Sequence, residues 1–206
     1  MHLGAGTNAI PPLKLTTGTV NTTASAGSYE YNGAHYETLV SNLRYGKGGC
    51  IFNAFADKGN VTIDETILHS YTTIANTFST NGESISANYG GVFVRSSTAT
   101  RKLKVYFGGT GGTQIFDSTA LITDNSSWTV TVMVMRVSAT VVRYMVYMNS
   151  PLADTALHTA AGELTGLTLS STNILKITGQ AAGVGAANDD IVLKLAGGTW
   201  LASANN

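Results

Sequence analysis

Hydrophobic and polar residues alternate with a period of two along most of the chain after residue 50, most clearly in "SSWTVTVMVMRVSATVVRYMVYMN", residues 126–149. Successive side chains of a β-strand point to opposite faces, so this period predicts strands. The two faces of the first strand are Trp128, Val130, Val132 and Val134 on one side and Thr129, Thr131, Met133 and Met135 on the other. A turn at residues 138–140 leads into a second strand over 141–149. Because both faces are largely apolar, we expect this sheet to be covered on both sides.

Shorter segments with the same pattern lie between turn signals elsewhere in the chain. They fall within residues 50–60, 61–74, 83–96, 102–118, 167–183 and 188–200. No stretch of a dozen residues carries the 3.6-residue period of a helix. About eight to ten evenly spaced strands and almost no helix predict an all-β protein, with a jelly-roll-like β-sandwich knob at residues 50–206.

The first 49 residues differ from the rest, and glycines at positions 46, 48 and 49 mark the boundary. They read as an extended N-terminal arm with a small hairpin at residues 29–39, "YEYNGAHYETL", whose turn is Asn32-Gly33. Such a segment cannot bury a core alone, so we expect it to attach to a partner. Tyrosine suits protein interfaces, although exposed rings could also stack on sugars. The candidate attachment residues are Pro11, Pro12, Leu13, Leu15, Tyr29, Tyr31 and Tyr36.

The composition narrows the classes of partner. Charged residues make up 12% of the chain, about half the usual share of roughly 25%, and the formal net charge is zero. Neither nucleic acid nor a membrane surface is therefore an expected partner. Cys50 is the single cysteine, which excludes an intrachain disulfide and fits a protein made in a reducing cytoplasm. With so little charge to protect sheet edges, we expect the chain to oligomerise.

Two glycine-rich tracts could be either phosphate-binding loops or hairpin loops, because glycine-rich loops can bind phosphate through their backbone amides. A phosphate loop is followed by a helix, whereas "FGGTGGTQIF", residues 107–116, runs between two strand-like segments. The tract at residues 179–189 likewise leads into a strand. Both tracts are therefore interpreted as hairpin loops. Their exposed residues are candidate receptor-facing positions: Gly108, Gly109, Gly111, Gly112, Gly183, Gly185 and Asn188.

The sequence shows no recognisable catalytic or metal-binding pattern. The four histidines, at positions 2, 35, 69 and 158, lack the spacing of a metal pair, and His69 is expected at a sheet surface or interface. No G-x-S-x-G motif accompanies the serines. Asp189 and Asp190 are adjacent, so they suit a turn before the last strand better than a glycosidase pair. We expect no enzymatic activity, no cofactor and no metal.

Two stretches resemble known proteins. "AGTNAIPPLKLTTGT" and "AGSYEYNGAHYET", residues 5–19 and 26–38, resemble a motif common in predicted phage tail-fibre and virion structural proteins. "KLKVYFGG", "SSWTVTVMVMRV" and "NDDIVLKLAGGTW" resemble the C-terminal β domain that often accompanies it. The resemblance covers most of the chain in the same order. It implies a homotrimeric, non-enzymatic component of a tailed-phage particle, made in the bacterial cytoplasm and located on the virion surface.

The resemblance leaves two roles open. In the first, the chain is a capsid decoration or cement protein: residues 1–49 grip the major capsid protein or another virion protein, and residues 50–206 form a short outward spike. The lack of a collagen-like or coiled-coil shaft favours this role. In the second, the chain is a tail-fibre receptor-binding protein whose sandwich loops contact host surface glycans.

Overall fold

The computed structural model describes residues 28–31, 35–40, 43–46, 49–61, 63–94, 99–119, 121, 125–150 and 158–201. These residues form β-strands and connecting loops, and none of them is helical. The chain divides into two compact units, residues 1–48 and residues 49–206. The predicted all-β sandwich is confirmed.

The described part of the first unit is a three-stranded antiparallel sheet. Its strands are β1 (Tyr29–Tyr31), β2 (His35–Val40) and β3 (Leu43–Gly46), in the order β1-β2-β3. Tyr31 lies opposite His35, so β1 and β2 form the predicted hairpin. The sequence pattern did not reveal β3, which extends the hairpin by one strand.

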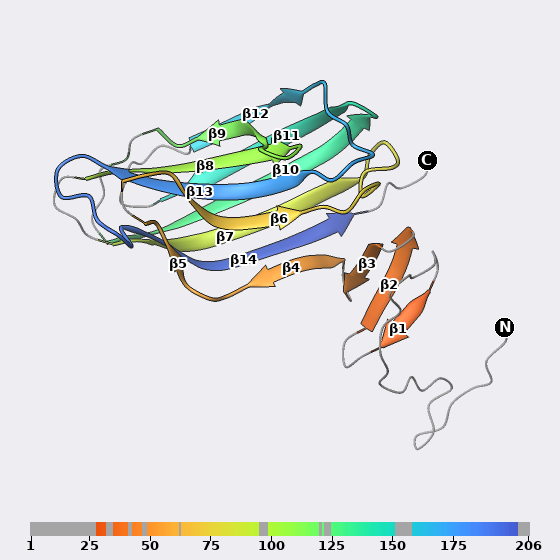
Figure 1. Cartoon of the computed structure of the whole chain (residues 1–206), viewed down its shortest axis with the longest axis horizontal. Helices are drawn as coiled ribbons and strands as arrows, with labels where there is room; N and C mark the ends of the chain where they lie inside the picture. The colour runs from red at the N-terminus through yellow and green to blue at the C-terminus, as the bar shows by residue number, and fades with distance from the viewer. Residues whose placement is uncertain are drawn as a thin grey trace, which may run out of the picture. The chain divides into compact units, whose positions relative to one another are not determined.

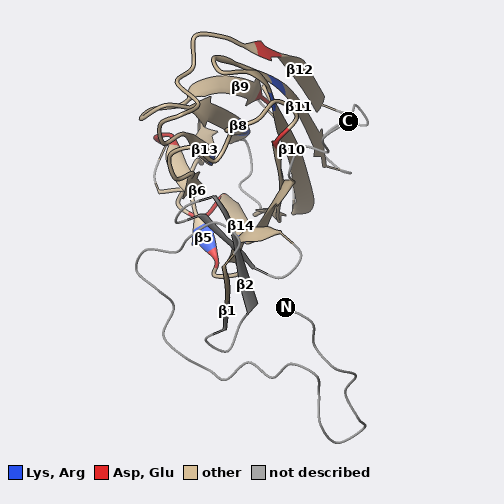
Figure 2. Ribbon diagram, turned by 90° about the vertical axis from the view of Figure 1, so that its right-hand side faces the viewer, with Lys and Arg blue, Asp and Glu red and all other residues tan. Residues whose placement is uncertain are grey.

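The second unit is a sandwich of two antiparallel sheets, visible as two layers in Figure 2. The larger sheet has the order β12-β11-β10-β7-β14-β4, with β5 also paired to β14, and the smaller sheet has the order β6-β13-β8-β9 (Figure 1). The strand bounds are β4 (Cys50–Ala54), β5 (Lys58–Gly59), β6 (Thr66–Thr72), β7 (Ser84–Phe93), β8 (Thr100–Gly108), β9 (Thr113–Asp117), β10 (Ser126–Ser138), β11 (Val141–Asn149), β12 (His158–Leu164), β13 (Ile174–Ala182) and β14 (Ile191–Leu201).

The core lies between the two sheets and is built from the apolar side chains that alternate along each strand and point inward. Trp128, Val130, Val132 and Val134 of β10 and Leu103, Val105 and Phe107 of β8 line the two sides of this core, and all of these side chains are almost fully buried. Trp128 fits against the sheet because Gly91 opposite it has no side chain: a Cβ there would lie 2.5 Å from the indole. Burial of such side chains supplies the main driving force for folding.

Two expectations about the sheets are not met within the single chain. The face of β10 that carries Met133 and Met135 is exposed, because nothing in the described residues covers it. The tract at residues 179–189 is also not a hairpin loop. It carries the chain from β13 in the small sheet to β14 in the large one, because β13 already has β6 and β8 at its two edges. The tract at 107–116 does connect the β8–β9 hairpin, as predicted.

Candidate functional site on the outer face of the large sheet

The outer face of the large sheet is ordered into rows that run across the strands. Strand register places Met145 of β11 beside Met133 of β10, which is beside Ser86 of β7. The adjacent row runs from Tyr147 through Thr131 to Asn88. It continues through Gly197 of β14 to Asn53 of β4. The β10–β12 end of the face is therefore rich in methionine, whereas the β7–β14–β4 end is rich in amides and hydroxyls.

We call the first of these regions the methionine face: Met133, Met135, Met145 and Ala161, with Arg143 and Glu163 at its margin. These residues line a shallow depression of about 520 Å³. Each of the three methionines is 37–39% exposed, although methionine usually packs in a core. Arg143 Nε lies 2.8 Å from Glu163 Oε1 in a largely exposed ion pair, which adds little stability.

The second region is a hollow of about 430 Å³, here called the amide hollow. It is lined by Cys50, Asn53, Ala54, Phe55, Ser86, Asn88, Leu195, Ala196, Gly197, Gly198 and Thr199, none of which is charged. The Phe55 side chain at its rim is 86% exposed. Thr131 Oγ1 donates a 2.8 Å hydrogen bond to Asn88 Oδ1, which fixes the orientation of the Asn88 amide.

Glycine keeps the amide hollow open. A Cβ at Gly197 would lie 3.2 Å from Asn53 Oδ1, so the missing side chain is what allows the Asn53 amide to lie over β14. A Cβ at Gly90 would similarly lie 3.2 Å from the Leu195 side chain. Leu195 itself follows a register shift in β14, and such a bulge changes the direction in which a side chain points. The hollow is thus a product of local strand irregularity and two small residues.

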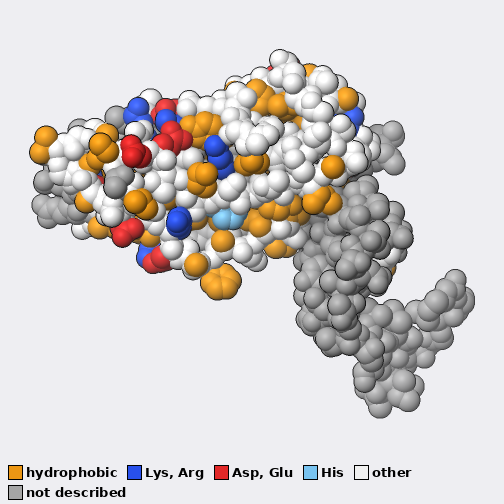
Figure 3. All heavy atoms as spheres, in the orientation of Figure 1, with side chains coloured by type: hydrophobic (Ala, Val, Ile, Leu, Met, Phe, Trp, Pro, Cys, Tyr) orange, Lys and Arg blue, Asp and Glu red, His pale blue; other side chains and the backbone are white. Residues whose placement is uncertain are grey.

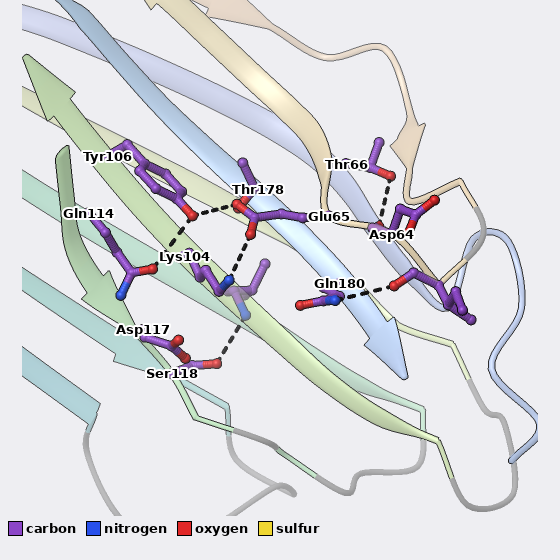
Figure 4. Close-up of polar contacts among 12 residues, drawn as sticks. Asp64, Glu65, Thr66, Lys104, Tyr106, Gln114, Asp117, Ser118, Thr178 and Gln180 are labelled. Carbon is purple, nitrogen blue, oxygen red and sulfur yellow. Dashed lines mark hydrogen bonds and ion pairs between the residues drawn. The ribbon is translucent and has the colours of Figure 1, made fainter. Parts of the chain in front are cut away.

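A separate polar cluster lies on the small sheet. Charged side chains gather over one half of this side of the molecule (Figure 3), and Figure 4 shows Glu65 at the centre of the cluster. Glu65 accepts hydrogen bonds from Lys104 Nζ at 2.7 Å, Tyr106 OH at 2.6 Å and Thr178 Oγ1 at 2.8 Å. Gln180 Nε2 donates a 3.3 Å bond to the Ile63 carbonyl. The cluster attaches the loop before β6 to β8 and β13.

The protonation of the cluster follows from these contacts. Partial burial opposes ionisation of Glu65, but the hydrogen bonds from its three partners and the positive charge of Lys104 outweigh it and lower the pKa of the carboxyl. Burial, followed by the neighbouring Glu65 carboxylate, raises the pKa of the Tyr106 hydroxyl. Glu65 is therefore a stable carboxylate and Tyr106 a stable neutral donor. Because each satisfies the other, we assign the cluster a structural role.

His69 lies on β6, the edge strand of the small sheet, and is half-buried, so it lies partly at the sheet surface as expected while its ring packs inward. Its ring lies 4.7 Å from that of Phe52 and 5.8 Å from that of Tyr89. A register shift in the β6–β13 pairing turns His69 toward the large sheet. Burial lowers the pKa of His69, so the neutral imidazole is favoured.

The predicted receptor-facing loops lie at opposite ends of the small sheet. Gly108 pairs with Ile174 at the start of β13, whereas Ala182, just before Gly183, pairs with Thr100 at the start of β8. Nine residues of strand, roughly 30 Å, separate them. Gly109 and Gly111 are exposed, as are Gly183, Gly185 and Asn188, whereas Gly112 is half-buried and Gly108, the last residue of β8, is buried, so Gly108 does not face a receptor as expected. The two loops therefore lie too far apart to contact one flat receptor surface together.

The predicted attachment residues lie mostly outside the described part of the chain. Pro11, Pro12, Leu13 and Leu15 are outside it altogether. Tyr31 and Tyr36 are placed in β1 and β2 by their backbone, and the Tyr29 side chain is 69% exposed. Within the described residues, His, Cys, Asp and Glu form no group of three that could hold a metal ion. Nor do these residues include a helix long and apolar enough to cross a membrane.

The residues of the amide hollow were not identified from the sequence. Alternation along β7 does place Ser86 and Asn88 on the face opposite Tyr89, but the sequence analysis did not use this signal. Their proximity to Asn53, however, depends on β14 lying between β7 and β4. That strand order has no local signal in the sequence.

Comparison with known proteins adds no family assignment. No protein-family model matches the chain, and no curated protein matches it. Among solved structures, the chain is similar to peanut lectin with a nine-residue peptide, at 12% identity and a TM-score of 0.38, over 75% of this chain and 98% of the lectin chain. It is also similar to a structure of infectious bursal disease virus strain Gx, at 13% identity and a TM-score of 0.24, over 80% of this chain and 37% of that chain. At these TM-scores neither similarity indicates a shared function.

Proposed function

We propose that this chain is a non-enzymatic structural protein of a tailed-phage virion: a homotrimer that decorates the capsid surface as a short spike. Residues 1–49 serve as its attachment base on the major capsid protein or another virion protein, and residues 50–206 project outward. The structural observation that supports an assembling protein is the exposed methionine face. The resemblance of residues 5–38 to virion proteins supports the setting.

The methionine face suits burial against neighbouring copies of the chain. Soluble monomers rarely expose a contiguous apolar patch without a partner, and methionine adapts its shape to the surface it meets. The margin of the face offers one charge of each sign, Arg143 and Glu163, so an identical surface presents complementary charges. The face also ends at β12, which among the described strands has β11 as its one neighbour. A copy that covers the methionines would shield this edge as well.

A lysine at the centre of the face tests the proposal. Light scattering of the full chain should give a mass about three times 21.5 kDa, the expectation for a closed trimer. Met133→Lys should shift the mass toward 21.5 kDa, because burying an unpaired ammonium group is costly. Ile67→Lys is the matched control, since Ile67 is a half-exposed apolar residue on β6 of the small sheet. This control should remain trimeric.

Two results would contradict the proposed assembly. One is a wild-type mass of 21.5 kDa, which would mean that the chain does not associate. The other is a Met133→Lys variant that folds and keeps the wild-type mass, which would place the subunit contact elsewhere. Circular dichroism of each variant separates loss of assembly from loss of folding.

A second candidate function is receptor binding by a tail fibre, with sandwich loops that contact host surface glycans. The observation that favours it is the openness of the β8–β9 loop: a Cβ at Gly109 or Gly111 would meet no atom within 4 Å. In this role, Gly109→Lys in the full chain should weaken binding to host cells and leave the trimer intact. Unchanged cell binding would argue against this role for the loop.

A further inference from the structure

We propose that the amide hollow is a binding site for a neutral saccharide, held on the sheet face across β4, β14 and β7. This site is distinct from the loops considered above. It adjoins the methionine face, because Ser86 in its lining pairs with Met133, but its other lining residues lie on or beside β4, β7 and β14. The inference rests on these residues and not on the proposed assembly. A particle-surface protein with such a site could contact glycans while the methionine face is buried.

The first argument is the supply of polar groups. The side chains of Asn53, Ser86 and Thr199 line the hollow and make no hydrogen bond with the described residues. Asn88 Oδ1 is occupied by Thr131, which leaves the two N–H donors of its Nδ2 for a ligand. Amides and hydroxyls together offer both donors and acceptors. Sugar hydroxyls need both, since each can donate and accept.

The second argument is the aromatic ring at the rim. Phe55 is 86% exposed, the largest exposure of any aromatic side chain in the described residues, and it borders the hollow. The face of a phenyl ring is electron-rich and attracts positively polarised hydrogens. One face of a pyranose ring presents such C–H groups, whereas its hydroxyls point outward around the ring. A sugar that stacks on Phe55 would therefore turn its hydroxyls toward the amides.

The third argument is the absence of charge in the lining, which selects against other ligands. An anion or cation would meet no counter-charge among the lining residues, and Lys194 beside the hollow is already paired with Asp57. A purely apolar ligand would bury the Asn53 and Asn88 amides without replacing their water, which is costly. The volume of about 430 Å³ falls in the range of small-molecule sites. A neutral sugar meets all three conditions.

The polar row also suggests how much of a chain of sugars could bind. Asn53, Asn88 and Thr131 lie on β4, β7 and β10, and β14 fills the gap between β4 and β7. Three strand spacings of about 4.8 Å span roughly 14 Å. We therefore expect an oligosaccharide of two or three units, laid across the strands, to bind more tightly than a monosaccharide.

The chain carries its own reporter for this site. Cys50 is the only cysteine, and it lines the hollow. The full-length protein is mixed with a chromogenic disulfide reagent, and the rate of Cys50 modification is followed with increasing lactose, maltose, cellobiose or diacetylchitobiose. We expect at least one of these disaccharides to slow modification in a saturable way. The corresponding monosaccharides should require higher concentrations.

Three variants test whether the sugar binds in the amide hollow. Phe55→Ala removes the ring, and Asn88→Asp keeps the acceptor for Thr131 but replaces the Nδ2 donor with a charged oxygen. Gly197→Ala displaces the Asn53 amide. Each should raise the apparent Kd about tenfold, the scale expected when one buried hydrogen bond or contact is lost. Ile67→Ala, on the other sheet, should leave the apparent Kd unchanged.

The inference is overturned if none of the disaccharides protects Cys50, or if protection is the same in all three variants as in the wild type. These results are separate from the assembly test. The mass of the Met133→Lys variant tests the proposed assembly. Protection of Cys50 tests whether the amide hollow binds a sugar. Equal protection by the charged sugar sialyllactose and by lactose would also overturn the selectivity for neutral ligands.

Discussion

Replacing Arg101 should destabilise the sandwich strongly, because its charge is buried against a buried partner. Arg101 lies on the core face of β8 with no exposed surface. Its Nη2 is 4.0 Å from Asp190 Oδ1 and donates a 2.8 Å hydrogen bond to the Val94 carbonyl. Asp190 also accepts a 2.8 Å bond from the Ala187 amide. The pair thus joins β8 of the small sheet to the residue just before β14. Residues further along β14 line the amide hollow.

Arg101→Met keeps an unbranched side chain in the core but leaves Asp190, only 3% exposed, without its cation. Removing one partner of a buried ion pair costs about 3–5 kcal/mol. We expect the free energy of unfolding in urea to fall by about this amount at neutral pH. For a unit of this size the melting temperature should fall by roughly 6–20 °C.

The control is Lys102→Met, which changes the same charge one residue further on, where the side chain points outward from the small sheet. Its effect should stay within about 0.5 kcal/mol. The double variant Arg101→Met/Asp190→Asn should be more stable than Arg101→Met alone, because no buried charge remains. A cost below about 1 kcal/mol for Arg101→Met, or a double variant no better than the single one, would refute the reasoning.

Three further results are expected. Gly91→Ala should prevent folding, because its Cβ would lie 2.0 Å from the Val192 carbonyl, whereas Gly109→Ala meets nothing within 4 Å and should be tolerated; soluble yield and circular dichroism compare them. Burial lowers the pKa of His69, so the unfolded chain binds its proton more readily; stability should fall as the pH drops below about 6.5, and His69→Phe should flatten this part of the profile measured by thermal melting. Glu65→Gln removes the charge that its three donors share and should lower stability by about 1 kcal/mol, with faster hydrogen exchange at residues 63–65; unchanged exchange would contradict the role assigned to the cluster.

Local periodicity predicted most of the fold, because alternation reports directly which side of a strand each residue occupies. It gave the β10–β11 hairpin and the β8–β9 hairpin. It even contained a signal for Arg101, which falls in phase with Leu103, Val105 and Phe107. The Asp190 partner could not be predicted, since it lies eighty-nine residues away in the sequence and on the other sheet.

Alternation does not show whether an apolar outer face is covered, which is why the methionine face was expected to be buried. It also contains no strand order. The connection at residues 179–189 was therefore interpreted as a hairpin, and the closeness of Asn53 to Asn88 was not foreseen. Both depend on which strands become neighbours, and this is decided by the packing of the whole sandwich.

The most direct test of the proposed function is antibody–gold electron microscopy of intact phage particles, with antibody raised against residues 50–206. A capsid decoration protein should place gold over the head, and a chain that lacks residues 1–49 should fail to bind particles that lack the protein. Gold confined to the tail would contradict capsid decoration and favour the tail-fibre role. Particles without any gold would contradict the virion assignment itself.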